Sequence, residues 1–388
     1  MSKENLMNTY GRFDVVFEKG LGTKVYDVNG KEYLDFVSGV AVNCLGHSHP
    51  IIAKTLAEQS QQLIHVSNLY WNTKQLALAK KLADHTDHQR VFFCNSGTEA
   101  VETALKLARK YGKTNGHENK TEILYMDNSF HGRSMGALAV TGQQKYQKAF
   151  MPLMKGVTSV KFNDIEDLKS KMNENVCGII LEPVQGEGGI VPVEKSFLQE
   201  VRALCDAYDA LLLFDEVQCG IGRTGELFAY QNFGVIPDVI SMAKGLGGGF
   251  PIGATLATEK AASAYAPGDH GCTFGGNPLA CAVGLAVLEE LIDGGVIKGV
   301  TETGQYLTGK IEELKNKYEG IEGVQGMGLM LGIKLSIETK KVVNKAFEKG
   351  LLLVGAGENV VRILPPLNVT KEEIDQAIAI LGEVFQEI

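Results

Sequence analysis

Several features that mark other classes of protein are absent from this sequence of 388 residues. No stretch approaches the about 20 apolar residues of a membrane-spanning helix. The first residues, Met1–Asn5, lack the apolar core of a signal peptide. The seven cysteines are scattered and form no CxxC pair, which is typical of a protein from a reducing compartment. We therefore expect a cytoplasmic protein that is not bound to a membrane.

Basic charge and sequence repeats are also scarce. The net charge of −8 does not favour a nucleic-acid partner, because phosphates require basic surface. No run of like charges is long enough to form a tail, and no internal period indicates a solenoid. A chain of this length, with 44% hydrophobic residues, is expected to fold as one large domain plus a smaller one.

Short apolar runs alternate with helical stretches between about residues 90 and 260. The runs show no polar alternation, as expected of strands that helices cover on both faces. They are Val91–Cys94, Ile123–Met126, Cys177–Leu181, Ala210–Phe214 and Val239–Met242. A helix is predicted over Thr98–Tyr111, and Ser196 with Gln199 has the pattern of a capping box. This alternation predicts an α/β fold with a mainly parallel sheet, whose ligands bind at the carboxyl ends of the strands.

The two ends of the chain have a different pattern. Asn29–Gly30 lies between two half-apolar runs and predicts a β-hairpin. Near the other end, the segment Thr370–Glu373 has the pattern of a capping box before a final helix. We predict that residues 50–285 form a large α/β domain, and that residues 1–49 and 286–388 together form a smaller α+β domain.

Two charged residues stand where ligands of such a sheet bind. Asp215 directly follows the run that ends at Phe214, and a buried carboxylate there needs a partner such as a protonated ring nitrogen. A helix cap or an ion pair would also explain Asp215. Lys244 follows the run that ends at Met242 and precedes a glycine-rich turn. Burial makes such an amine a usable nucleophile, although an ordinary lysine before a flexible loop would have the same pattern.

A third segment, Asn95–Ala100, joins an apolar run to the predicted helix. Free backbone amides at a helix N-terminus favour an anion such as phosphate, although a plain N-cap uses the same residue types. An anion site, a strand-end carboxylate and a strand-end lysine are together what pyridoxal 5′-phosphate (PLP) requires. Phe130, in the segment after the run ending at Met126, is placed to stack on the cofactor ring.

The order of seven sequence blocks resembles the class III (ω-amino-acid) aminotransferases, which are PLP-dependent enzymes of fold type I. The resemblance runs from about Asn8 to the C-terminus, and it is closest to the members that act on acetylornithine. The blocks are Leu34–Phe36 with Leu45–Pro50, Asn95–Ala100, Phe130–Arg133, Leu181–Gly189, Phe214–Gln218, Ala243–Gly245 and Thr273–Pro278.

The resemblance implies a cofactor site. Lys244 would form the Schiff base with PLP and carry the proton, and Asp215 would pair with the pyridine nitrogen. The implied cofactor-binding residues are Gly97, Thr98, Phe130, Asp215, Glu216, Val217, Gln218, Lys244 and Thr273. Thr273 comes from the partner subunit in this family, so the resemblance also implies a homodimer with two shared sites.

The resemblance also implies how substrates are held. Arg133 would bind the α-carboxylate of acetylornithine, and Arg362 that of glutamate or 2-oxoglutarate. Glu187 would pair with Arg362 while the amine donor is bound; a structural ion pair is the alternative reading of Arg362. Cys272 stands where a Ser or Thr that contacts substrate is expected, and a thiol is a weaker hydrogen-bond donor.

The activity that follows is transfer of the δ-amino group of N2-acetyl-L-ornithine to 2-oxoglutarate by a ping-pong cycle. The products are N-acetylglutamate 5-semialdehyde and L-glutamate, as in arginine biosynthesis. Alternatives are a class III enzyme acting on succinylornithine, ornithine, 4-aminobutyrate or an N-acyl-lysine, a PLP aminomutase, and a non-catalytic binding protein.

Three weaker signals are set aside. Gly304–Lys310 has the spacing of a phosphate-binding loop, but Ile311 replaces the required Ser or Thr and the segment is helical in pattern. Gly326–Gly332 lacks the context of a dinucleotide-binding motif and is typical of a tight strand. His47 and His49 have no Cys or carboxylate cluster nearby in sequence, so a turn before Pro50 is predicted rather than a metal site.

Overall fold

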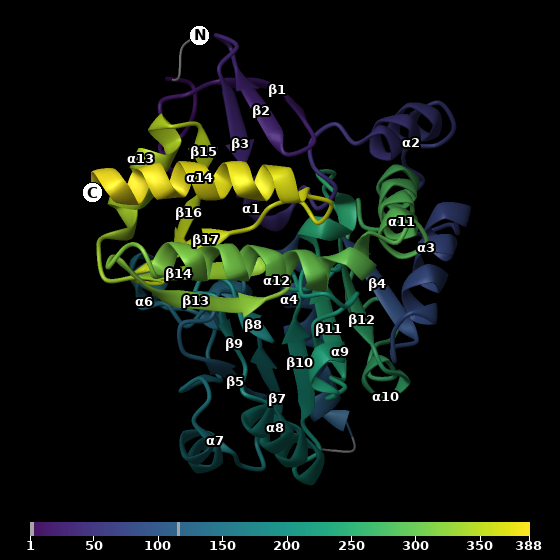
Figure 1. The fold of residues 1–388 in the computed structure, drawn as a ribbon. Helices are drawn as coiled ribbons and strands as arrows, with labels where there is room; N and C mark the ends of the chain where they lie inside the picture. Colours follow the sequence, from purple (N-terminus) through teal and green to yellow (C-terminus); the bar gives the residue numbers. More distant parts are fainter. Residues whose placement is uncertain (1–3, 115–116) are drawn as a thin grey trace.

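The computed structural model describes residues 4–114 and 117–388. A seven-stranded sheet forms the centre of the fold (Figure 1). In order across the sheet its strands are β4 (Arg90–Cys94), β12 (Gly253–Ala257), β11 (Val239–Met242), β10 (Leu211–Asp215), β7 (Val176–Leu181), β5 (Glu122–Met126) and β6 (Val157–Val160). β12 is antiparallel to both neighbours, and all other neighbours are parallel. The predicted α/β class with a mainly parallel sheet is confirmed, as are the predicted strands.

Both faces of this sheet are buried, which explains why its strands are apolar without alternation. Leu213 faces one side, in a cluster with residues of α4 (Gly97–Gly112). Phe214 faces the other side, in a cluster with residues of α8 (Lys195–Ala207). The predicted helix over Thr98–Tyr111 is therefore confirmed. Because successive strand residues point to opposite faces, the sheet can bury an unbroken apolar run only between two helical layers.

The remaining elements between about residues 50 and 292 surround the sheet. These elements are α2 (Pro50–Ser60), α3 (Thr73–Asp84), α5 (Met135–Ala139), α6 (Gln144–Gln147), η2 (Lys148–Phe150), α7 (Ile165–Lys171), β8 (Val184–Gln185), β9 (Val191–Pro192), α9 (Tyr230–Phe233), η3 (Lys244–Gly247), α10 (Glu259–Ala262) and α11 (Pro278–Ile292). α11 packs against both α2 and α3 at the side of β4 and β12 (Figure 1).

Segments from the two ends of the chain meet in one sheet. Its strands, in order, are β1 (Phe17–Leu21), β2 (Lys24–Asp27), β3 (Glu32–Asp35) and β15 (Leu351–Leu352). A further sheet contains β13 (Ile321–Met327), β14 (Met330–Leu335), β17 (Val360–Ile363) and β16 (Val354–Ala356). Helices α12 (Val296–Lys315), α13 (Thr339–Glu348) and α14 (Lys371–Glu387) accompany these sheets, and α1 (Ser38–Ala41) precedes the central part. The boundaries 49/50 and 285/286 between two domains stay a prediction.

Local predictions at these ends are confirmed, whereas one at α8, beside the central sheet, is not. β2 and β3 form the predicted hairpin around Asn29–Gly30, and Thr370 with Glu373 forms the predicted capping box. Residues 304–310 lie within the helix α12, which agrees with the rejection of this segment as a phosphate-binding loop. Residues 326–332 lie in the β13–β14 hairpin, which agrees with the rejection of this segment as a dinucleotide-binding motif. The capping box at Ser196 was wrong, because α8 begins at Lys195 with Glu194 as its N-cap.

Within the described ranges, no helix combines the length and apolar character that a membrane crossing requires.

Candidate active site

A cavity of about 410 Å³ lies at the carboxyl ends of β10 and β11, where the sheet topology predicts a ligand. It receives side chains from the loops after β4, β5, β7, β10 and β11. The predicted site residues that line it are Gly97, Thr98, Phe130, Arg133, Glu187, Asp215, Val217, Gln218 and Lys244. Segments far apart in sequence therefore converge on one space, as the sequence analysis predicted.

Lys244 lies two residues after the end of the strand β11 and begins η3. Its backbone has a φ of 43°, a left-handed conformation that costs about 1–3 kcal/mol in a residue with a side chain. Burial of the amine lowers the pKa of Lys244, and the nearby Arg362 guanidinium lowers it further. The site therefore holds a lysine whose neutral, nucleophilic form is favoured.

Asp215 ends the strand β10 and is 4% exposed. Its Oδ2 lies 2.7 Å from Nδ1 of His131, and its Oδ1 accepts a hydrogen bond of 3.0 Å from the Val217 N–H. These contacts hold the carboxylate in a fixed orientation at the cavity. His131 Nε2 is buried and has no hydrogen-bond partner among the described residues.

Glu182 places a second buried carboxyl beside Asp215. The strand register pairs Leu181 with Phe214, so the next residues, Glu182 and Asp215, lie at the carboxyl ends of neighbouring parallel strands. Glu182 accepts hydrogen bonds of 3.0 Å from the N–H groups of Phe130 and Gly186. Burial raises the pKa of Glu182 to about 7; His131 opposes this shift and Asp215 adds to it.

The N-terminus of α4 forms another wall of the cavity. Ser96 caps the helix by accepting a hydrogen bond from the Glu99 N–H, and Gly97 is its first residue. A Cβ at Gly97 would lie 2.6 Å from Cγ1 of Val217, so only glycine allows this close approach. The Thr98 hydroxyl lies 2.5 Å from that of Ser134. The first turn of a 16-residue helix therefore presents an anion-binding end to the cavity.

Arg362, on β17 of the second four-stranded sheet, is 1% exposed and contacts two residues that line the cavity. Its Nη1 donates to Oε1 of Glu187 at 2.7 Å and to Oε1 of Gln218 at 3.0 Å. The predicted pairing of Arg362 with Glu187 is thus present. Arg133 lies elsewhere on the cavity wall, with its guanidinium 4.0 Å from the ring centre of Tyr146 and 5.7 Å from that of Phe130.

Besides Arg362, three predicted residues do not line the cavity. Glu216 is fully buried on the other side of its loop, where it accepts hydrogen bonds from the N–H groups of Ala229 and Tyr230. Cys272 and Thr273 line a neighbouring cavity of about 380 Å³, which shares Asn95 with the first. The binding roles of these three residues stay predictions.

Comparisons with known proteins identify the family. The chain matches the class III aminotransferase family over residues 6–385. The chain belongs to the class III aminotransferases.

Relatives of this aminotransferase match nearly the whole length of its sequence. It is 59% identical to the acetylornithine aminotransferase of Clostridium acetobutylicum over 99% of both chains. It is 50% identical to that of Aquifex aeolicus, over 98% of this chain and 99% of the relative. A similar solved structure is the ornithine aminotransferase of Toxoplasma gondii, with 30% identity, a TM-score of 0.95 and coverage of 99% and 93%. The N-acetylornithine aminotransferase of Stenotrophomonas maltophilia matches with 37% identity, a TM-score of 0.86 and coverage of 97% of both chains.

Sequence reasoning assigned no role to two residues of this aminotransferase site, His131 and Glu182. Both lie in sequence blocks that were recognised, but their contacts with Asp215 and with Phe130 depend on how separate strands align. The available signal was that the apolar run 176–181 is followed by Glu182, and the apolar run 211–214 by Asp215. Acids that follow successive buried strands are expected to meet at one sheet edge.

Proposed function

We propose that this aminotransferase transfers the δ-amino group of N2-acetyl-L-ornithine to 2-oxoglutarate, with PLP held by Lys244. The products would be N-acetylglutamate 5-semialdehyde and L-glutamate, as in arginine biosynthesis. The observation that carries the proposal is one cavity lined by Lys244, Asp215, Arg133 and Glu187, the last of which is paired with Arg362 behind the cavity wall. Relatives named as acetylornithine aminotransferases at 49–59% identity support the choice of amine donor.

The cavity fits PLP by the chemistry of its walls. Class III aminotransferases are PLP-dependent, and a volume of about 410 Å³ suits a cofactor of that size. Gly97 and Thr98 at the α4 N-terminus would hold the phosphate. Phe130 and Val217 offer apolar surface for the ring, and the fixed Asp215 carboxylate would face its nitrogen. When bound, PLP supplies an electron sink for the electrons released at the substrate carbon.

The chain's own groups would perform the remaining tasks. The lowered pKa of Lys244 leaves its amine able to accept a proton from the substrate carbon and to return it. Asp215 would keep the ring nitrogen protonated, and His131 and the Val217 N–H prevent the carboxylate from turning away. Gln218 would contact the ring hydroxyl from the same loop.

The two arginines would let one cavity accept two substrates in turn. Arg133 would bind the α-carboxylate of acetylornithine, while Glu187 neutralises Arg362 as it does in this structure. When 2-oxoglutarate enters, its α-carboxylate would replace Glu187 on Arg362, because a guanidinium binds carboxylates through paired hydrogen bonds. Glu187 has the freedom to move, since its side chain is 23% exposed.

We further propose a homodimer in which Cys272 and Thr273 serve the partner's site. This proposal is supported by their position outside the chain's own cavity and by nearby exposed apolar side chains. Phe274 is 61% exposed, and Tyr70 and Trp71 are 65% and 84% exposed, which is typical of an interface rather than of free surface. Seven free cysteines support the proposal that the enzyme works in the cytoplasm.

Kinetic comparison of amine donors tests the proposed substrate. We expect kcat/KM with 2-oxoglutarate as acceptor to be highest for N2-acetylornithine among acetylornithine, succinylornithine, ornithine and 4-aminobutyrate. Omitting 2-oxoglutarate should abolish turnover, which an aminomutase would not show. A higher kcat/KM for free ornithine or 4-aminobutyrate would contradict the choice of donor.

A further inference from the structure

Arg223 is a buried cation whose hydrogen bonds, among the described residues, go to backbone carbonyls. It lies in the loop between β10 and α9 and is 2% exposed. Its Nη1 donates to the carbonyl oxygens of Leu329, at 3.1 Å, and Pro365, at 2.5 Å. In the described part of the chain no carboxylate lies within ion-pair distance of it, and Nη2 has no hydrogen-bond partner. Burial lowers the pKa of Arg223 to about 10.

Such an arrangement is costly for the fold. Removing a charged group from water carries a penalty of about several kcal/mol, which two carbonyl contacts offset only in part. A well-packed apolar side chain would avoid that penalty. We therefore explain the presence of Arg223 by the two backbone segments that its hydrogen bonds connect, those of Leu329 and Pro365.

The two acceptor carbonyls belong to the segments that flank one strand pair. The antiparallel register of β14 and β17 pairs Gly332 with Arg362 and Leu331 with Ile363. Leu329 lies in the turn directly before β14, and Pro365 lies two residues after β17. Arg223 thus connects the two segments next to the strand pair that carries Arg362.

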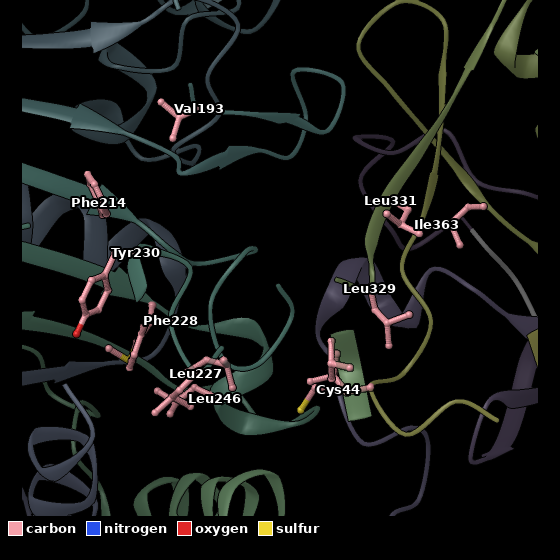
Figure 2. Close-up of a cluster of buried hydrophobic side chains, with 14 of the residues drawn as sticks. Cys44, Val193, Phe214, Leu227, Phe228, Tyr230, Leu246, Leu329, Leu331 and Ile363 are labelled. Carbon is pink, nitrogen blue, oxygen red and sulfur yellow. The ribbon is translucent and has the colours of Figure 1, made fainter. Parts of the chain in front are cut away.

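The contact with the β13–β14 turn is reciprocal and closely packed. The Leu329 N–H donates to the backbone oxygen of Arg223 at 3.0 Å. Gly328 has a φ of +56°, and a Cβ there would lie 2.7 Å from that same oxygen. Leu329 also belongs to the buried cluster with Cys44 and Leu246 that Figure 2 shows, so the turn rests on a packed core.

The loop that carries Arg223 also holds Arg362 itself. Gln218, five residues earlier, accepts a hydrogen bond from Arg362 Nη1. The segment 215–223 therefore contacts β17 at Arg362 through Gln218, and the chain two residues after β17, at Pro365, through Arg223. The same segment begins with Asp215 at the cavity.

We propose that Arg223 is a positioning residue for Arg362, which sets where the substrate-binding guanidinium stands relative to Lys244. The inference rests on the proposed role of Arg362 in binding the α-carboxylate of 2-oxoglutarate. One nitrogen, Nη1, donates to both carbonyls and so connects the two segments, whereas a lysine side chain is one bond shorter and does not carry its amine to the same position. We call the two hydrogen bonds from Arg223 to Leu329 and Pro365 the clamp. Its loss would let β17 shift, and a misplacement of Arg362 by about 1 Å is sufficient to weaken the binding of 2-oxoglutarate strongly.

The test compares the two substrates of the PLP-loaded enzyme. For Arg223→Lys we expect KM for 2-oxoglutarate to rise about tenfold, while KM for acetylornithine changes by less than about twofold. The inhibition constant of glutarate, a dicarboxylate that does not react, should rise with KM for 2-oxoglutarate. Arg202→Lys is the matched control, because Arg202 is a largely buried arginine paired with Asp238, and it should leave both KM values unchanged.

Gly328→Ala tests the same clamp from the opposite side and replaces Arg223→Lys if that variant does not fold. Its Cβ would push the turn away from Arg223, and the same selective rise in KM for 2-oxoglutarate is expected. Equal effects on both substrates, or none on either, would overturn the proposed clamp. If Arg362→Ala also leaves glutarate inhibition unchanged, the proposed role of Arg362 fails as well. A selective effect of Arg362→Ala alone would reject only the clamp.

Discussion

Replacing Arg362 by alanine should impair the half-reaction with 2-oxoglutarate far more than the half-reaction with acetylornithine. In the structure Arg362 Nη1 lies 2.7 Å from Glu187 and 3.0 Å from Gln218, and the arginine is 1% exposed. Removing one partner of a buried charge pair costs about 3–5 kcal/mol. Each 1.4 kcal/mol corresponds to a factor of about ten, so the full loss is about 10²-fold to 4 × 10³-fold. Because 2-oxoglutarate must first displace Glu187 in the natural enzyme, we expect kcat/KM for 2-oxoglutarate to fall about 10²-fold.

Acetylornithine should be far less affected, since its carboxylate is assigned to Arg133. The freed Glu187 side chain is already 23% exposed and can turn to solvent, so no buried charge is left unpaired. We expect kcat/KM for acetylornithine to change by less than about threefold. Single-turnover measurements of each half-reaction, followed by the cofactor's absorbance, give the two constants separately. An equal fall in both half-reactions would refute the reasoning.

Two further variants test the buried acids. Asp215→Asn should retain some PLP yet lose most activity, because the ring nitrogen loses the anion that keeps it protonated; near-normal kcat measured with saturating PLP would argue against this role. Glu216 has its pKa raised from 4.5 to about 8 by burial, so its contribution to stability is present below pH 4.5 and is lost as the pH rises to about 8. Glu216→Gln should therefore flatten the fall in Tm of the cofactor-free protein between pH 5 and pH 8, and a Tm profile parallel to that of the unmodified chain would be evidence against it.

The central sheet and most of the cavity follow from local patterns in the sequence. Unbroken apolar runs such as Ala210–Phe214 indicate strands buried on both faces, and the polar residue after each run marks the ligand edge. Lys244 and Asp215 were found in this way. The helix over Thr98–Tyr111 was predicted equally well, because its apolar stripe and its N-terminal turn both indicate a helix that begins near Thr98.

Contacts that depend on alignment between distant strands were not accessible. Glu182 lies beside Asp215 only because Leu181 and Phe214 are in register. Arg223 has the pattern of an exposed charge in a glycine-rich turn, and its burial depends on the β13–β14 turn more than 100 residues away. Even the local prediction at Ser196 was wrong, because the N-cap of α8 is Glu194, two residues earlier.

The account depends most directly on the attachment of the cofactor to Lys244. Incubation with PLP, reduction with borohydride and mass spectrometry of the peptides locate the modified residue. We predict a single pyridoxyl group on Lys244 and none in Lys244→Ala. A cofactor found on another lysine, or on no residue of the natural sequence, would contradict the account.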